Sequence, residues 1–329
     1  MPTTDYAVDV AQLKKNFGRV EALRDLNLTV PTGRVTGFLG PNGSGKTTTI
    51  RVLLGLLRAD GGVARLLGGD PWREAVRLHG RLVYVPGDVA LWPNLTGGQI
   101  IDVLGRLAGG LEPDRRARMI ERFEFDPTKK ARTYSKGNRQ KVALVAALAS
   151  RAELLILDEP TSGLDPIMEQ AFTETIREIK AEGRSVLLSS HIFAEVEKLA
   201  DQVTIIRDGV TVEQGTLDQL RRRTRTQVRV TLAQPGDALA GLPGVHDYAH
   251  DGEQTSFSVD TTALPDVLAR LAQFGPRALV ANPPSLEDIF LSHYEAVAGV
   301  SAPPTGVVAP GTVLPAPGAP AAQGTESRR

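Results

Sequence analysis

The sequence contains no cysteine and no long uninterrupted apolar run. Without cysteine the chain cannot form disulfides, thiolate metal sites or a cysteine nucleophile, and a reducing compartment is permitted. The apolar stretches fall far short of the roughly 20 residues that a membrane-spanning helix needs. The first residues, Met1–Asp5, also lack the basic start and apolar run of a secretory signal. We therefore expect a soluble chain in the cytoplasm that does not cross a membrane itself.

Net charge is also absent, because 38 lysine and arginine residues balance 38 aspartate and glutamate residues. This balance argues against bulk attraction to nucleic acid or anionic lipid, so we expect no nucleic-acid partner. A hydrophobic content of 41% and a charged content of 23% are ordinary for a chain that forms a core. A length of 329 residues favours two domains.

Residues 1–220 alternate short apolar runs with amphipathic stretches. Val35–Leu39 and Leu154–Leu157 are typical of strands buried on both faces, and Met168–Lys180 is typical of a helix. Such alternation predicts an α/β domain around a largely parallel sheet. The predicted fold class is therefore an α/β domain followed by a smaller unit.

Residues 226–297 have a different pattern. Val228, Val230 and Leu232 alternate with polar residues as in a half-exposed strand, and Leu264–Phe274 is typical of a helix. These features predict a small C-terminal α+β domain. Residues 298–329 hold six proline and five glycine residues with little charge, so we expect a disordered tail.

A phosphate-binding loop follows the strand predicted at Val35–Leu39. Gly40–Thr47 fits the pattern G-x-x-x-x-G-K-[ST], in which glycines let successive backbone N–H groups face phosphate oxygens. The lysine adds a positive charge at the β- and γ-phosphates, and the threonine hydroxyl ligates Mg²⁺. A helix predicted over Thr48–Leu57 would direct its positive end at the phosphates. The predicted nucleotide ligands are Gly40, Pro41, Asn42, Gly43, Ser44, Gly45, Lys46, Thr47 and Thr48.

An acidic pair ends the apolar run Leu154–Leu157. Asp158 is placed to hold Mg²⁺ together with Thr47, and Glu159 is placed to act as the base that polarises the attacking water. Together with the phosphate loop, this pair predicts a nucleoside-triphosphate hydrolase with Mg²⁺ as cofactor.

Further stretches complete a recognisable order of motifs. They are Lys15–Gly18, Asp88–Asn94, Tyr134–Asn138, Ser162–Asp165 and Ser189–His191. With the loop and the acidic pair, this order resembles the nucleotide-binding subunit of an ATP-binding-cassette (ABC) transporter, over roughly Tyr6–Gln219. The resemblance implies a parallel-sheet core with an antiparallel β subdomain and a helical subdomain at about residues 97–150.

The resemblance also implies roles for individual residues. Phe17 would stack on adenine, and Lys46 and His191 would join Glu159 as catalytic residues, with His191 sensing the γ-phosphate. Asp88–Asn94 would contact the membrane partner. The residues that would complete the site from the opposite subunit are Ser135, Gly137, Asn138 and Asp165. From the residues alone, Ser135 is also a good helix N-cap, and the two interpretations are compatible.

Partners and location follow from the same resemblance. It implies a separate polytopic permease and either a homodimer or pairing with a second ATP-binding subunit, at the cytoplasmic face of the membrane. The C-terminal Pro284–Phe290, with Tyr134–Gly137 and Pro86–Asp88, resembles exporters of antibiotics and drugs. A soluble ABC-type ATPase and a nucleotide-dependent switch without transport remain the alternatives.

Three positions depart from the family pattern. In the signature motif at Tyr134–Asn138, Lys136 replaces the first glycine and Asn138 replaces the glutamine. Gly87 stands where the family carries a glutamine that ligates Mg²⁺. We expect a water or Asp88 to occupy that metal position, and hydrolysis to be slowed rather than abolished.

Overall fold

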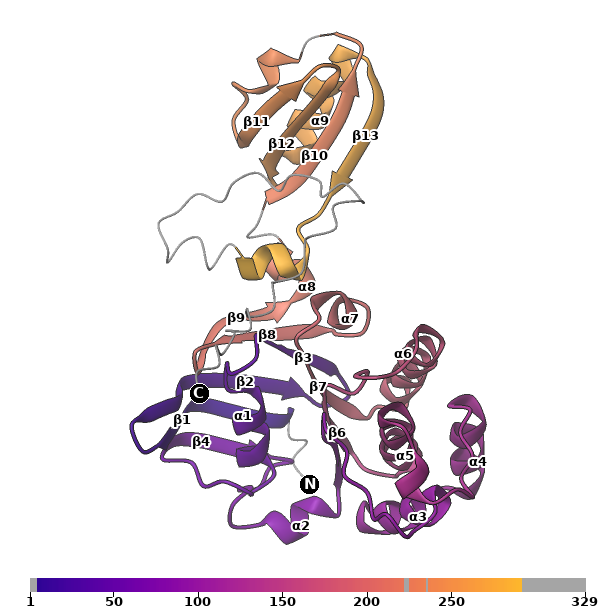
Figure 1. The fold of residues 1–329 in the computed structure, drawn as a ribbon. Helices are drawn as coiled ribbons and strands as arrows, with labels where there is room; N and C mark the ends of the chain where they lie inside the picture. The colour runs from indigo at the N-terminus through magenta and orange to yellow at the C-terminus, as the bar shows by residue number, and fades with distance from the viewer. Residues whose placement is uncertain (1–4, 222–224, 235, 292–329) are drawn as a thin grey trace, which may run out of the picture.

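The structure is a computed structural model, and it describes residues 5–221, 225–234 and 236–291. Two sheets organise these residues (Figure 1). The larger sheet has nine strands in the order β4-β1-β2-β9-β8-β3-β7-β6-β5. In that order they are Gly61–Leu66, Tyr6–Phe17, Val20–Pro31, Val210–Thr216, Gln202–Arg207, Val35–Leu39, Ser185–Ser190, Leu154–Asp158 and Leu82–Val85.

The middle of this sheet is parallel, as the apolar runs predicted. Strand β3 pairs in parallel with β7 and β8, and β6 pairs in parallel with β5 and β7. Every residue of β3, β6 and β7 is buried, which matches strands covered on both faces. Strands β1, β2 and β4 add an antiparallel part at one side.

Helices cover both faces of the large sheet, with α3–α6 gathered on one side (Figure 1). The helices are α1 Lys46–Leu53, α2 Ala75–His79, α3 Gly97–Leu107, α4 Pro113–Arg122, α5 Lys136–Ala149, α6 Pro166–Ala181, α7 Phe193–Glu197 and α8 Leu217–Arg221, with a 3₁₀ turn at Ala131–Thr133.

The predicted end of the first helix at Leu57 is wrong. Helix α1 ends at Leu53, and its N-terminal boundary lies at Lys46 rather than Thr48. Gly55 follows with a left-handed φ of 65°, a conformation in which glycine commonly terminates helices.

Alternate residues of the buried strands belong to two separate hydrophobic cores, one on each face of the sheet. In β6, Leu155 and Leu157 join a cluster with α5 and α6, whereas Leu154 and Ile156 join a cluster that includes Ile50 of α1. This is the alternation expected of a strand. The segments that follow β3 and β6 therefore begin from strands held between two packed layers.

The smaller sheet is antiparallel and has the order β11-β12-β10-β13. Its elements are β10 Arg225–Leu232, β11 Val245–Asp251, β12 Gln254–Asp260, α9 Leu264–Leu271 and β13 Pro276–Asn282, with 3₁₀ turns at Asp237–Leu239 and Ala272–Phe274. Valine and phenylalanine side chains of β10 and β12 pack with α9 in a third core. The strand at 245–251 is an addition to the elements predicted from sequence.

Residues 286–291 form the final described helix, which lies beside α8 (Figure 1). Its start agrees with the predicted cap, since the Ser285 amide donates to Asp288 Oδ2 at 2.9 Å and the Asp288 amide donates to Ser285 Oγ at 3.1 Å. The tail predicted at 298–329 lies outside the described residues. Within the described ranges, no helix is long and apolar enough to span a bilayer.

Candidate nucleotide site

The phosphate-binding loop connects the end of β3 to the start of α1. Gly43 and Gly45 have left-handed φ values of 82° and 112°, which residues with a side chain rarely adopt. A Cβ on Gly45 would also stand 2.7 Å from the Leu23 side chain. The glycines are therefore required by backbone geometry, and the loop turns tightly enough to present its amides to one cavity.

Lys46 is buried at the base of this loop. Its Nζ donates to the carbonyl oxygens of Gly40 at 2.6 Å and Pro41 at 3.2 Å. Burial lowers the pKa of Lys46 from 10.5, and the carboxylates of Glu159 and Asp158 oppose that shift. A phosphate anion would favour the charged ammonium further, so the group is suited to bind one.

The two residues predicted to hold the metal lie together. Thr47 Oγ1 donates to Asp158 Oδ2 at 3.4 Å, and the Ser189 hydroxyl donates to Asp158 Oδ1. These are oxygen donors of the kind that Mg²⁺ prefers, and Mg²⁺ keeps several waters rather than requiring an all-protein cage. The donor set therefore fits a magnesium ion bound with phosphates. The contact of Ser189 with Asp158 was not predicted from the sequence, because it depends on the pairing of β6 with β7.

Glu159 stands directly after β6 and faces His191. The Nδ1 atom of His191 lies 2.7 Å from Oε2 of Glu159. Glu159 has a left-handed φ of 49°, which is costly for a residue with a side chain and is characteristic of functional sites. Its amide donates to the Ser189 carbonyl at 3.0 Å, so β7 holds this backbone in place.

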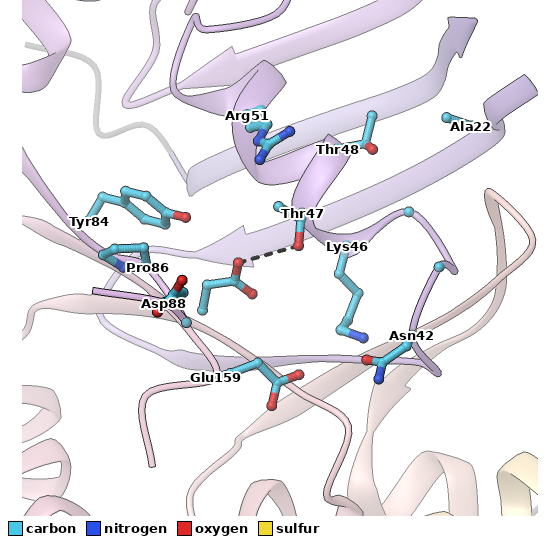
Figure 2. Close-up of a pocket in the computed structure, with 14 residues that line it drawn as sticks. Ala22, Asn42, Lys46, Thr47, Thr48, Arg51, Tyr84, Pro86, Asp88 and Glu159 are labelled. Carbon is cyan, nitrogen blue, oxygen red and sulfur yellow. Dashed lines mark hydrogen bonds between the residues drawn. The ribbon is translucent and has the colours of Figure 1, made fainter. Parts of the chain in front are cut away.

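A cavity of about 430 Å³ joins these groups (Figure 2). That size is within the usual range of ligand pockets, roughly 300–1,000 Å³. Eight predicted ligands line it, namely Asn42, Gly43, Gly45, Lys46, Thr47, Thr48, Asp158 and Glu159. The lining also includes Ala22, Arg51, Tyr84 and Pro86, which were not singled out as ligands by sequence. Gly87 and Asp88, the latter a predicted candidate for the vacant metal position, complete it.

Tyr84 directs its hydroxyl toward Thr47 in this cavity (Figure 2). Burial, and secondarily Asp158, raises the pKa of Tyr84 to about 12, so the hydroxyl remains a hydrogen-bond donor at neutral pH. Gly87 is packed closely, because a Cβ there would lie 3.2 Å from the Asp158 carbonyl oxygen and 3.3 Å from the Glu159 Cβ. A glutamine at this position therefore requires small movements of its neighbours.

Phe17 and the signature residues are not among those that line the cavity. The Phe17 side chain is 47% exposed, and Lys15 Nζ lies 5.6 Å from the centroid of its ring. Ser135 caps α5 by accepting from the Asn138 amide at 3.3 Å. A Cβ on Gly137 would stand 2.5 Å from the Gly163 carbonyl oxygen, so this glycine permits close contact between the stretches 134–138 and 162–165.

Two further residues join these same stretches. Lys136 Nζ donates to Ser162 Oγ at 3.2 Å. Asp165 caps α6, accepting from the amides of Ile167 at 3.1 Å and Met168 at 3.0 Å. The residues predicted to act on a nucleotide in an opposite subunit are thus gathered on one surface of this chain.

Comparison with known proteins places this geometry in a family. The family "ABC transporter" matches residues 23–162, and the family "ATP-binding protein DrrA1-3-like, C-terminal domain" matches residues 215–294. The "Daunorubicin resistance ATP-binding protein DrrA3" of Streptomyces coeruleorubidus is 35% identical over 304 residues, covering 87% of this chain and 95% of that protein. The "Bacitracin transport ATP-binding protein BcrA" of Bacillus licheniformis is 33% identical, covering 73% and 81%.

Solved structures agree with this placement. An "ATP binding subunit of ABC transporter" superposes with a TM-score of 0.62 at 30% identity, covering 66% of this chain and 92% of that one. The dimeric "ATP-binding cassette MJ0796 bound to ADP and Pi" shares the fold at 20% identity, with a TM-score of 0.58 and coverage of 64% and 98%. The loop, the acidic pair, the sheet order and these matches lead to one conclusion: the chain belongs to the ATP-hydrolysing, ATP-binding subunits of ABC transporters.

Proposed function

We propose that this chain uses ATP to drive export of antibiotics, drugs or other hydrophobic molecules through a separate membrane subunit. The observation that carries the ATP-hydrolysing part of the proposal is the Glu159–His191 contact at 2.7 Å, in which Glu159 shares a cavity lining with Lys46, Thr47 and Asp158. This arrangement combines a phosphate-binding loop with a positioned carboxylate, and it is suited to hydrolysis as well as binding.

The loop 40–48 binds the triphosphate of ATP, and Lys46 neutralises charge on the β- and γ-phosphates. Thr47 and Asp158 hold Mg²⁺, which supplies charge neutralisation where phosphate oxygens become more negative. Phe17 stacks on the adenine ring. Phe17 is 47% exposed, and its ring is therefore accessible to a base.

Glu159 orients and polarises the water that attacks the γ-phosphate. His191 holds the Glu159 carboxylate through the 2.7 Å contact and interacts with the γ-phosphate itself. The loop 40–48 therefore binds the nucleotide, and the segments that follow β6 and β7 supply the residues for hydrolysis.

A second copy of this chain, or a paired ATP-binding subunit, completes each site. Ser135, Gly137 and Asn138 lie at the start of the 14-residue helix α5, whose positive end favours a phosphate anion. Asp165 lies on the adjoining stretch. When two subunits close around ATP, these residues contact the nucleotide of the opposite subunit, and hydrolysis releases them.

The membrane subunit is a separate polytopic chain, and this protein acts at its cytoplasmic face. Support for export comes from relatives whose names refer to daunorubicin resistance and bacitracin transport. The C-terminal match at residues 215–294 is shared with the daunorubicin-resistance type of ATP-binding protein. The loop 88–94 is the proposed contact with the membrane subunit.

A pull-down of tagged Glu159→Gln protein with ATP from detergent-solubilised membranes of its own source tests this function. Mass spectrometry is expected to recover a polytopic membrane protein in near-equal amount, because the variant holds ATP without hydrolysing it. The matched control is Glu121→Gln, which removes an exposed carboxylate of α4. Ribosomal or DNA-bound proteins without a membrane partner would favour the soluble ATPase instead.

A further inference from the structure

The last described helix, residues 286–291, follows the smaller sheet in the chain and packs into the core beside the nine-stranded sheet, called here the ATPase unit. Leu286, Ile289 and Phe290 are 1%, 4% and 8% exposed and belong to the same apolar cluster as the central strands. The rings of Phe290 and Phe193 lie 5.1 Å apart between centroids. Phe193 is the first residue of α7. The C-terminal unit is therefore attached to α7 by buried aromatic contact.

Polar contacts attach the same helix a second time. Glu197, at the end of α7, accepts at Oε1 from the Leu286 amide at 3.1 Å and from Arg221 Nη2 at 3.1 Å. Arg221 precedes the smaller sheet in the chain, and Leu286 follows it. The entry and exit of the C-terminal unit thus meet at one partly buried carboxylate of α7.

The other side of α7 contacts the segments that carry Glu159 and His191. The helix begins two residues after His191. Its Glu195 accepts at Oε2 from Thr161 Oγ1 at 2.9 Å and from Ser190 Oγ at 3.3 Å. Thr161 lies two residues after Glu159, and Ser190 precedes His191, so α7 contacts both segments that carry the pair.

We propose that Phe290, acting through Phe193 and α7, is a positioning residue that holds His191 against Glu159. The inference rests on the roles proposed above for those two residues. It assigns the C-terminal unit a task in hydrolysis: the unit sets the rate of the chemical step and leaves ATP affinity unchanged. No residue of the loop 40–48 belongs to the apolar cluster that contains Phe290.

The first experiment compares steady-state ATP turnover of the full-length parent with Phe290→Ala and Phe290→Leu. Misplacing a catalytic group by about 1 Å can cost on the order of 100-fold in rate, so a kcat loss of about tenfold is expected for Phe290→Ala. The KM for ATP is expected to stay within about twofold. Phe290→Leu, which keeps apolar volume in the core, is expected to recover part of the rate.

The matched control is Phe274→Ala, because Phe274 is partly buried against the core of the smaller sheet. This variant is expected to keep the parental kcat, although it also loses a ring from the C-terminal unit. A kcat loss equal to that of Phe290→Ala would show that general weakening of the unit is responsible, and would overturn the inference.

A double-mutant cycle with His191→Ala separates positioning from a general structural role. If Phe290 acts through His191, Phe290→Ala adds no further loss of turnover in the His191→Ala background. Hydrogen exchange supplies an independent measure: Phe290→Ala is expected to speed amide exchange over residues 191–197 and leave residues 46–53 unchanged.

Losses that multiply in the cycle, or unchanged exchange over 191–197, would overturn this inference while leaving the proposed hydrolysis intact. Parental turnover in His191→Ala alone would instead refute the proposed function of His191, and the inference with it. If Phe290→Ala does not fold, the same cycle and exchange measurement are made with Phe290→Leu, with smaller effects of the same sign.

Discussion

His191 and Glu159 form a close pair, with Nδ1 and Oε2 separated by 2.7 Å. The histidine side chain is 51% exposed and the glutamate side chain is 22% exposed, and Glu159 lines the cavity. Because the two residues follow neighbouring strands, β6 and β7, the parallel pairing of these strands fixes their separation. A carboxylate restrained in this way is placed to orient a water without reorganising first.

Glu159→Gln is expected to lower ATP turnover on the order of 100-fold, because removing a general base typically costs 10²–10⁴-fold. ATP binding is expected to persist, and the variant is expected to accumulate as an ATP-bound dimer. Turnover and light scattering after size-exclusion chromatography measure the two effects. Parental turnover in this variant would show that Glu159 is not the base, and Glu121→Gln is the control for loss of a carboxylate.

Lys46→Met is expected to abolish stabilisation by ATP without lowering the melting temperature of the nucleotide-free protein. Burial holds the pKa of Lys46 below 10.5, so the folded chain bears a cost for the charged ammonium at neutral pH. As the pH rises through the lowered pKa, this cost disappears and the parent gains stability relative to the variant.

Thermal denaturation at neutral and alkaline pH, with and without ATP, checks this prediction. Lys130→Met, which removes an exposed lysine, is the control. A lower melting temperature for nucleotide-free Lys46→Met would show that its hydrogen bonds to Gly40 and Pro41 outweigh the cost of burial.

Gly87→Gln is expected to lower the Mg²⁺ concentration needed for half-maximal turnover, because the amide oxygen adds a metal ligand where water or Asp88 would otherwise serve. Gly87→Ala separates this effect from crowding, since its Cβ would lie 3.2 Å from the Asp158 carbonyl oxygen. Turnover is measured across a Mg²⁺ titration. Identical Mg²⁺ dependence in the glutamine and alanine variants would argue against a vacant ligand position at Gly87.

Phe17→Ala is expected to weaken ATP binding about fivefold, which corresponds to about 1 kcal/mol for one aromatic stacking contact. Phe17→Trp is expected to keep or improve the affinity, because it retains a flat aromatic face. Equilibrium binding of ATP is compared with binding of inorganic triphosphate. A similar loss for triphosphate would indicate that Phe17 does not contact the base.

The strands and loop of the site follow directly from local sequence. Continuous apolar runs identified β3 and β6, and the glycine pattern identified the loop, because both depend on neighbouring residues only. Strand β11 was missed, since Val245–Asp251 carries polar side chains at most positions and lies at a sheet edge. Edge strands need little apolar surface and give a weak signal.

Contacts between distant segments could not be predicted in the same way. The Ser189 hydroxyl reaches Asp158 only because β7 pairs with β6 in one register. Tyr84 enters the cavity because β5 pairs with β6, and Glu197 receives two donors because the chain returns to α7 after a separate sheet. Each of these depends on tertiary register, which no local pattern encodes.

The return of residues 286–291 to the first core also bears on how the protein is made. The cluster that begins at Val35 is completed by Phe290, so the ribosome must synthesise nearly all the described chain before that core can close. Chains emerge with the N-terminal part first, and an incomplete core exposes apolar surface in the meantime. A chain truncated after α8 would therefore lack Leu286, Ile289 and Phe290, and the apolar side chains that they cover would be exposed to solvent.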